Sequence, residues 1–97
     1  MAIDAFLVLR EDRYETVHGD GYFAYYADAF ATRAEAEAFI RNNPEAMVAY
    51  HLRTGRLTNE SGVWTMTATL EPGERIDTNG DGVATDWAAV ARTLGAL

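Results

Sequence analysis

The sequence Ile3-Asp4-Ala5-Phe6-Leu7-Val8-Leu9 carries the clearest structural signal in this chain. After Asp4 the run has no polar residue, and four large apolar side chains follow one another from Phe6 to Leu9. A short continuous apolar run of this kind is typical of a strand that is buried on both faces. We therefore expect residues 3–9 to form the central strand of a sheet.

Three further segments have the character of strands. Residues 22–30 are rich in aromatic side chains and follow two glycines that permit positive φ, so we expect them to form a hairpin with the first strand. Residues 46–53 again look extended, and turns are expected at Thr54-Gly55 and at residues 59–62. Between residues 63 and 70, Trp, Met, Ala and Leu alternate with Thr, which predicts a strand with one core face and one solvent face.

Two helices are predicted from capping residues and spacing. Thr32 and Glu35 form a capping box, and Pro44 ends the first helix because it disfavours helical backbone angles in the residue before it. Thr85-Asp86 precedes a second helix, in which apolar residues recur at helical spacing from Trp87 onward. The sum predicts an α+β fold in one domain, residues 1–97, with an antiparallel sheet of four or five strands and both helices packed on one face.

Composition excludes several classes of function. The chain of 97 residues contains 15 acidic residues against 8 basic ones, and its net charge of -7 repels nucleic acid and anionic lipid. Without cysteine it has no disulfide, no thiolate nucleophile and no cysteine-based zinc site. The first ten residues lack the basic start of a signal peptide, and their apolar run is too short to span a membrane. A cytoplasmic protein is expected.

The segment Asp77-Thr78-Asn79-Gly80-Asp81-Gly82 has the residue types of a cation loop. Three side-chain oxygens at alternate positions, followed by Gly, suit a hard divalent cation. With the helix after it, the segment resembles the calcium loop of dockerin and other EF-hand-type repeats. That resemblance implies a calcium site whose ligands are Asp77, Asn79, Asp81, the Val83 carbonyl and Asp86.

The same loop departs from the EF-hand pattern at its end. The twelfth position is Ala88 instead of an acid, and Asp86 comes two residues earlier, as in a shortened loop. The alternative is that Asn79-Gly80 and Asp81-Gly82 are turn dipeptides, with Asp86 as a negative charge at the start of the second helix.

Tyrosine side chains offer a candidate surface for a partner. Tyr22, Tyr25 and Tyr26 lie in one predicted strand, where alternation sends about half of the rings to each sheet face. If one face is uncovered, these rings form an exposed aromatic platform suited to a protein partner or a homodimer. If both faces are covered, the rings belong to the core.

Three functions remain open. The leading one is a small acidic, non-catalytic binding or regulatory module that acts through protein–protein contact or self-association. The alternative is a calcium-binding domain that uses the loop at residues 77–86. The third is an enzyme, which would need a pocket that joins His51 or His18 to an acid such as Asp20 or Glu60.

Overall fold

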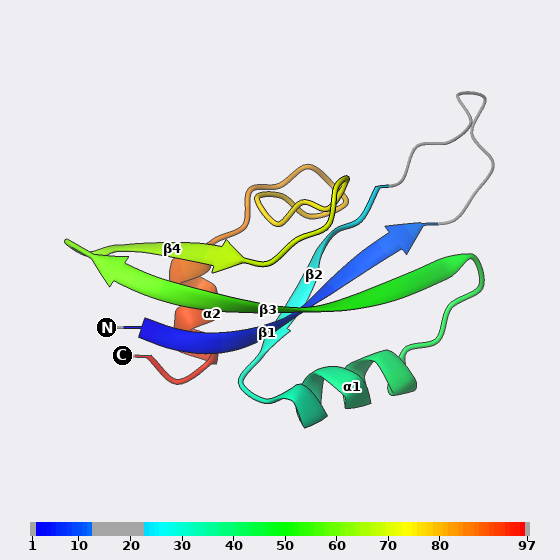
Figure 1. Cartoon of the computed structure of the whole chain (residues 1–97), viewed down its shortest axis with the longest axis horizontal. Helices are drawn as coiled ribbons and strands as arrows, with labels where there is room; N and C mark the ends of the chain where they lie inside the picture. The colour runs from blue at the N-terminus through cyan, green and yellow to red at the C-terminus, as the bar shows by residue number, and fades with distance from the viewer. Residues whose placement is uncertain (1, 13–22, 97) are drawn as a thin grey trace.

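The computed structural model describes residues 2–12 and 23–96 and shows an α+β fold with a four-stranded antiparallel sheet and two helices (Figure 1). In chain order the elements are β1 (Ala2–Asp12), β2 (Tyr25–Phe30), α1 (Arg33–Asn42), β3 (Val48–Glu60), β4 (Val63–Ala68) and α2 (Trp87–Thr93). The strand order is β2-β1-β3-β4. The predicted α+β class and antiparallel sheet are confirmed.

The first strand is central, as its apolar run predicts. β1 pairs with β2 on one side and with β3 on the other, and Leu7, Val8 and Leu9 are fully buried. The antiparallel pairing of β1 with β2 is also confirmed, with an irregularity in register between Val8 and Leu9. β2 begins at Tyr25, and residues 13–22, which include Tyr22, lie outside the described part of the chain.

The predicted turn at Thr54-Gly55 is wrong, because β3 continues through it to Glu60. Gly55 pairs with Ala5 of β1, and a Cβ added to it would lie 2.6 Å from the Met66 sulfur and 3.2 Å from a Leu7 methyl group. Glycine is therefore needed here for close packing within the sheet. The turn that ends β3 is Ser61-Gly62, where both residues have positive φ, and it joins β3 to β4 as a two-residue hairpin.

Both helices begin at the predicted caps. The Thr32 hydroxyl accepts a hydrogen bond from the Glu35 N–H at 3.2 Å, and it donates one to the Glu35 carboxylate at 2.8 Å. The Asp86 carboxylate accepts from the Ala89 N–H at 3.1 Å at the start of α2. Within the described residues, no helix is both long enough and apolar enough to cross a membrane.

The helices pack on opposite faces of the sheet, which corrects the prediction of a single covered face. Phe39 of α1 contacts Phe30, which pairs with Phe6 of β1, whereas Trp87 of α2 contacts Tyr26, which pairs with Leu9. Even and odd positions of a strand point to opposite faces. Because β1 is apolar at both sets of positions, each face of the sheet provides a core for one helix.

The segment between β4 and α2 crosses the sheet from one edge to the other. It leaves β4 at one edge and reaches β2 at the opposite edge, where Ala24 forms a parallel bridge with Glu74. The Ala24 N–H donates to the Gly73 carbonyl at 3.2 Å, and the Arg75 N–H donates to the Ala24 carbonyl at 2.8 Å. This crossover segment, residues 69–86, therefore extends the β2 side of the sheet before the chain returns to α2.

Candidate functional site

The predicted calcium loop is closed by its own hydrogen bonds. The Asn79 side-chain oxygen accepts from the N–H groups of Asp81 at 2.9 Å and Val83 at 3.2 Å. The Val83 carbonyl in turn accepts from the Asn79 N–H at 3.0 Å, and Thr78 forms an antiparallel bridge with Ala84. This is the local hydrogen bonding of an Asx turn, in which a side chain supports the turn of its own backbone.

The acids of the loop are not gathered around one point. Asp86 caps α2 with its carboxylate, and in residues 2–12 and 23–96 no group of three or more His, Cys, Asp or Glu side chains is placed to hold a metal ion. Asp77, Asp81 and Asp86 therefore do not form such a group. Calcium binding by this loop stays a prediction from the sequence pattern.

The tyrosines proposed as a platform do not share one exposed face. Tyr26 is half-buried on the α2 side, where its ring meets that of Trp87 edge-on at 5.3 Å between centroids, and burial raises its pKa to about 12. Tyr25 pairs with Arg10 at the next position of the strand, so its ring lies on the other side. A Cβ on Gly80 would lie 2.6 Å from that ring, which shows how closely the loop covers it.

Tyr25 also belongs to a charged cluster at the end of β1. Its hydroxyl donates to the Asp12 carboxylate, which also accepts from Arg10 Nε at 2.9 Å, and Arg10 forms an ion pair with Glu45 at 2.7 Å. Burial and then the hydrogen bond to Asp12 raise the pKa of Tyr25 to about 12. The hydrogen bonds from Tyr25 and Arg10 lower the pKa of Asp12. The cluster fixes the Tyr25 ring, so this ring is engaged within the fold.

A second cluster of titratable side chains links the sheet to the crossover segment, and it was not among the sites predicted from the sequence. Arg53 of β3 donates two hydrogen bonds to the Glu74 carboxylate, at 2.8 Å and 2.7 Å, and the Glu74 side chain is 0% exposed. Glu74 also accepts from the Glu71 N–H at 2.9 Å. Beside this pair, His51 Nε2 lies 3.4 Å from a carboxylate oxygen of Glu11. The Arg53–Glu74 pair ties the crossover segment to the sheet.

The acid beside His51 is a different one from the two named as candidates for an enzyme, Asp20 and Glu60. Glu60 lies nine positions beyond His51 on the same strand, which corresponds to about 30 Å, so these two residues cannot act together. His18 and Asp20 lie outside the described residues. The acid beside His51 is Glu11, which is two positions along β1 from Leu9, the residue opposite His51.

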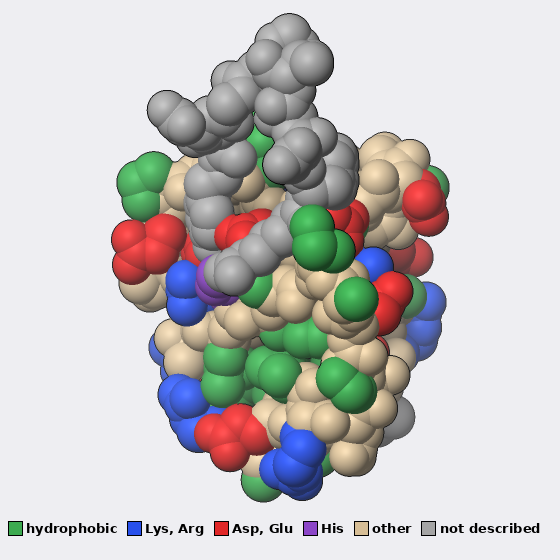
Figure 2. Space-filling model, turned by 90° about the vertical axis from the view of Figure 1, so that its right-hand side faces the viewer, with side chains coloured by type: hydrophobic (Ala, Val, Ile, Leu, Met, Phe, Trp, Pro, Cys, Tyr) green, Lys and Arg blue, Asp and Glu red, His purple; other side chains and the backbone are tan. Residues whose placement is uncertain are grey.

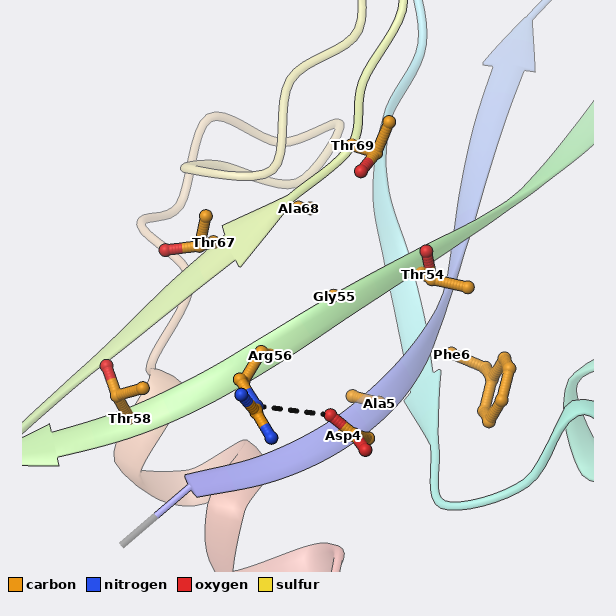
Figure 3. Close-up of a pocket in the computed structure, with 10 residues that line it drawn as sticks. All are labelled: Asp4, Ala5, Phe6, Thr54, Gly55, Arg56, Thr58, Thr67, Ala68 and Thr69. Carbon is orange, nitrogen blue, oxygen red and sulfur yellow. Dashed lines mark ion pairs between the residues drawn. The ribbon is translucent and has the colours of Figure 1, made fainter.

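On β3 and β4, the face of the sheet that points away from α2 is open and rich in threonine. Thr54, Thr67 and Thr69 are exposed there, and Arg56 forms an ion pair with Asp4 at 3.3 Å (Figure 3). These side chains surround a shallow concavity of about 690 Å³, which is lined by Asp4, Ala5, Phe6, Thr54, Gly55, Arg56, Thr58, Thr67, Ala68 and Thr69. The predicted alternation is confirmed, because threonines occupy this solvent face and half-buried Trp64, Met66, Ala68 and Leu70 occupy the other.

The outer edge of β4 lies beside this concavity. Within the described chain, β4 has a strand on one side alone, and its sequence Val63-Trp64-Thr65-Met66-Thr67-Ala68 contains no charge, proline or glycine. The end of the molecule that is on the right in Figure 1 has many charged side chains: Figure 2 shows acidic and basic side chains around a group of exposed hydrophobic ones. An uncharged strand edge therefore stands out on a protein with a net charge of -7.

No protein-family model matches the chain, and searches of curated proteins and of solved structures found no significant similarity.

Proposed function

We propose that this chain is a small non-catalytic binding module that acts through protein–protein contact, with the outer edge of β4 as its contact surface. The observation that carries the proposal is that β4 is an edge strand without any charged residue. An exposed strand edge presents a row of backbone N–H and C=O groups that can pair with another chain. Recognition by addition of a strand uses these groups for affinity and the neighbouring side chains for specificity.

The two edges of the sheet are protected to different degrees, and this difference supports the choice of β4. Along β2 the register with β1 is irregular, Asp28 introduces a charge, and the crossover segment bonds to Ala24 at the strand's start. Irregular register, charge and a covering segment are the usual means by which proteins block edge pairing. β4 carries none of the corresponding residues, so its edge is the one suited to a partner.

The hairpin between β3 and β4 determines which groups of β4 point outward. In a two-residue hairpin the residues that flank the turn, here Glu60 and Val63, form a hydrogen-bonded pair, and such pairs then alternate along the ladder. The Thr69 N–H donates to the Thr54 carbonyl at 3.2 Å, which continues this alternation. The backbone groups of Trp64, Met66 and Ala68 therefore point away from β3, where a partner strand would meet them.

The test compares the proteins captured by the wild-type chain and by a variant with a charged edge. Thr65→Lys/Thr67→Lys places two lysines beside the edge at exposed positions, and lysine at an edge opposes strand pairing. The control Asn42→Lys/Ala46→Lys adds the same charge at exposed positions near the end of α1. We expect bound proteins, quantified by mass spectrometry, to be retained by the wild type and the control and lost from the edge variant. Equal retention by all three would refute the proposal.

A further inference from the structure

We infer that the partner at this edge is a second copy of the chain, whose β4 pairs antiparallel with the first β4 about a two-fold axis at Met66. The inference rests on the proposed function, because it names the occupant of the same edge. The outward backbone groups at positions 64, 66 and 68 would then bond to positions 68, 66 and 64 of the other copy. The result is one continuous sheet with four strands from each copy.

The side chains of β4 are self-complementary in this register. On the α2 face, Trp64 lies opposite Ala68 of the other copy, so the largest side chain of the strand meets the smallest, and Met66 meets its own symmetry mate. On the open face, Thr65 lies opposite Thr67, and threonine pairs are favourable across strands. A two-fold interface requires that one patch fit itself, and the spacing of large and small residues on β4 meets this requirement.

Charge also favours a second copy in spite of the acidic composition. Two copies with a net charge of -7 repel each other at long range, yet β4 contributes no carboxylate that would face its symmetry mate. Two charged side chains on the neighbouring strand lie opposite residues of β4: Arg56, opposite Thr67 and paired with Asp4, and Glu60, opposite Val63 at the end of the strand. The residues of β4 therefore place no like charges opposite each other across the axis, and added salt should strengthen association by screening the long-range repulsion.

The test uses two variants that differ at one residue. In the proposed register Thr65 and Thr67 form non-hydrogen-bonded pairs across the axis, where side chains come closest. Thr65→Glu/Thr67→Glu places two glutamate pairs face to face. Thr65→Lys/Thr67→Glu places a lysine opposite a glutamate at both pairs. Because the substitution at Thr67 is common to both variants, its effect on the neighbouring Arg56 cancels in the comparison.

The readout is mass as a function of protein concentration, by sedimentation equilibrium or light scattering. We expect the wild type and the Lys/Glu variant to rise from the 10.7 kDa of one chain toward twice that mass. The dissociation constant of the Glu/Glu dimer should be about tenfold or more larger than those of the other two proteins, since like charges face each other at two pairs. Circular dichroism and tryptophan fluorescence establish that both variants are folded.

Three results would overturn the inference: a wild type that stays monomeric to millimolar concentration, equal association of the two variants, or stronger association of the Glu/Glu variant. The capture experiment separates this failure from failure of the proposed function. If the wild type is monomeric and the Thr65→Lys/Thr67→Lys variant loses the captured proteins, a second copy is excluded as the partner and the edge remains the proposed binding surface. If the wild type is monomeric and the lysine variant keeps the captured proteins, both the second copy and the edge are excluded.

Discussion

Replacement of Arg53 by methionine should destabilise the fold more than neutralisation of its partner Glu74. The two side chains share a bidentate contact but differ in burial, because the Glu74 side chain is 0% exposed and that of Arg53 is 26% exposed. Arg53→Met removes two hydrogen bonds from a carboxylate that is closed off from water. Glu74→Gln keeps an oxygen that can accept from the Glu71 N–H, and it leaves a guanidinium that reaches solvent.

The expected magnitudes follow from this difference in burial. Loss of one partner from a buried ion pair costs about 3–5 kcal/mol, because the remaining charge is poorly solvated in a medium of low polarity. Loss of a hydrogen bond to a group that can be hydrated costs about 1–2 kcal/mol. We therefore expect the free energy of unfolding to fall by at least about 1 kcal/mol more for Arg53→Met than for Glu74→Gln.

Equilibrium unfolding in urea, followed by the fluorescence of Trp64 and Trp87, measures these free energies. The control is Arg56→Met, since Arg56 pairs with Asp4 at the surface, where the side chains are 63% and 79% exposed. This control should change stability by less than about 1 kcal/mol. A cost for Glu74→Gln equal to or above that of Arg53→Met, or an Arg56→Met cost as large as that of Arg53→Met, would refute the reasoning from burial.

Three further outcomes are expected. Gly55→Ala should lower the free energy of unfolding by about 1–3 kcal/mol in urea titrations, because its Cβ would lie 2.6 Å from the Met66 sulfur; a loss undiminished in a Met66→Ala background would contradict this cause. Tyr25 and Tyr26 have pKa values of about 12 in the fold against the ordinary value of 10.0, so their side chains ionise at lower pH in the unfolded chain. The free energy of unfolding should therefore fall as pH rises from 10 to 12. Titration of both tyrosines near pH 10 in the folded protein, measured by tyrosinate absorbance, would contradict this expectation. If the loop at residues 77–86 binds calcium, millimolar calcium should raise the melting temperature, and Asp81→Ala should abolish the rise; identical melting with and without calcium would end that hypothesis.

The parts of the fold that the sequence predicted correctly are those with local causes. Thr32 and Asp86 cap helices through atoms within three residues of themselves, and the alternation from residue 63 to residue 70 requires only a strand with one covered face. The apolar run of β1 likewise predicts a central strand whatever its neighbours are. Each of these signals is complete within a short window, so no knowledge of the tertiary structure is needed to interpret it.

The errors have tertiary causes. Gly55 resembles a turn residue in sequence, and its role depends on Leu7 and Met66, which approach it from other strands. The helix positions also depend on tertiary contacts. The amphipathic stripes of α1 and α2 predict that each helix packs on a sheet, but they do not indicate which face it covers. The contacts of Phe39 with Phe30 and of Trp87 with Tyr26 decide that question, and both join separate elements.

The candidate sites show the same difference between local and tertiary causes. The loop at residues 77–86 is conspicuous in sequence because its residues are contiguous, and the hydrogen bonds of Asn79 show that this residue supports a turn. The Arg53–Glu74 pair, which joins residues 21 positions apart, has no sequence signal, because the position of Arg53 opposite Leu7 follows from the strand pairing. The sequence gives no sign that β4 is an edge strand, because this property follows from the strand order alone. The absence of charge from β4 acquires meaning only when that order is known, since the same six residues in a central strand would be ordinary.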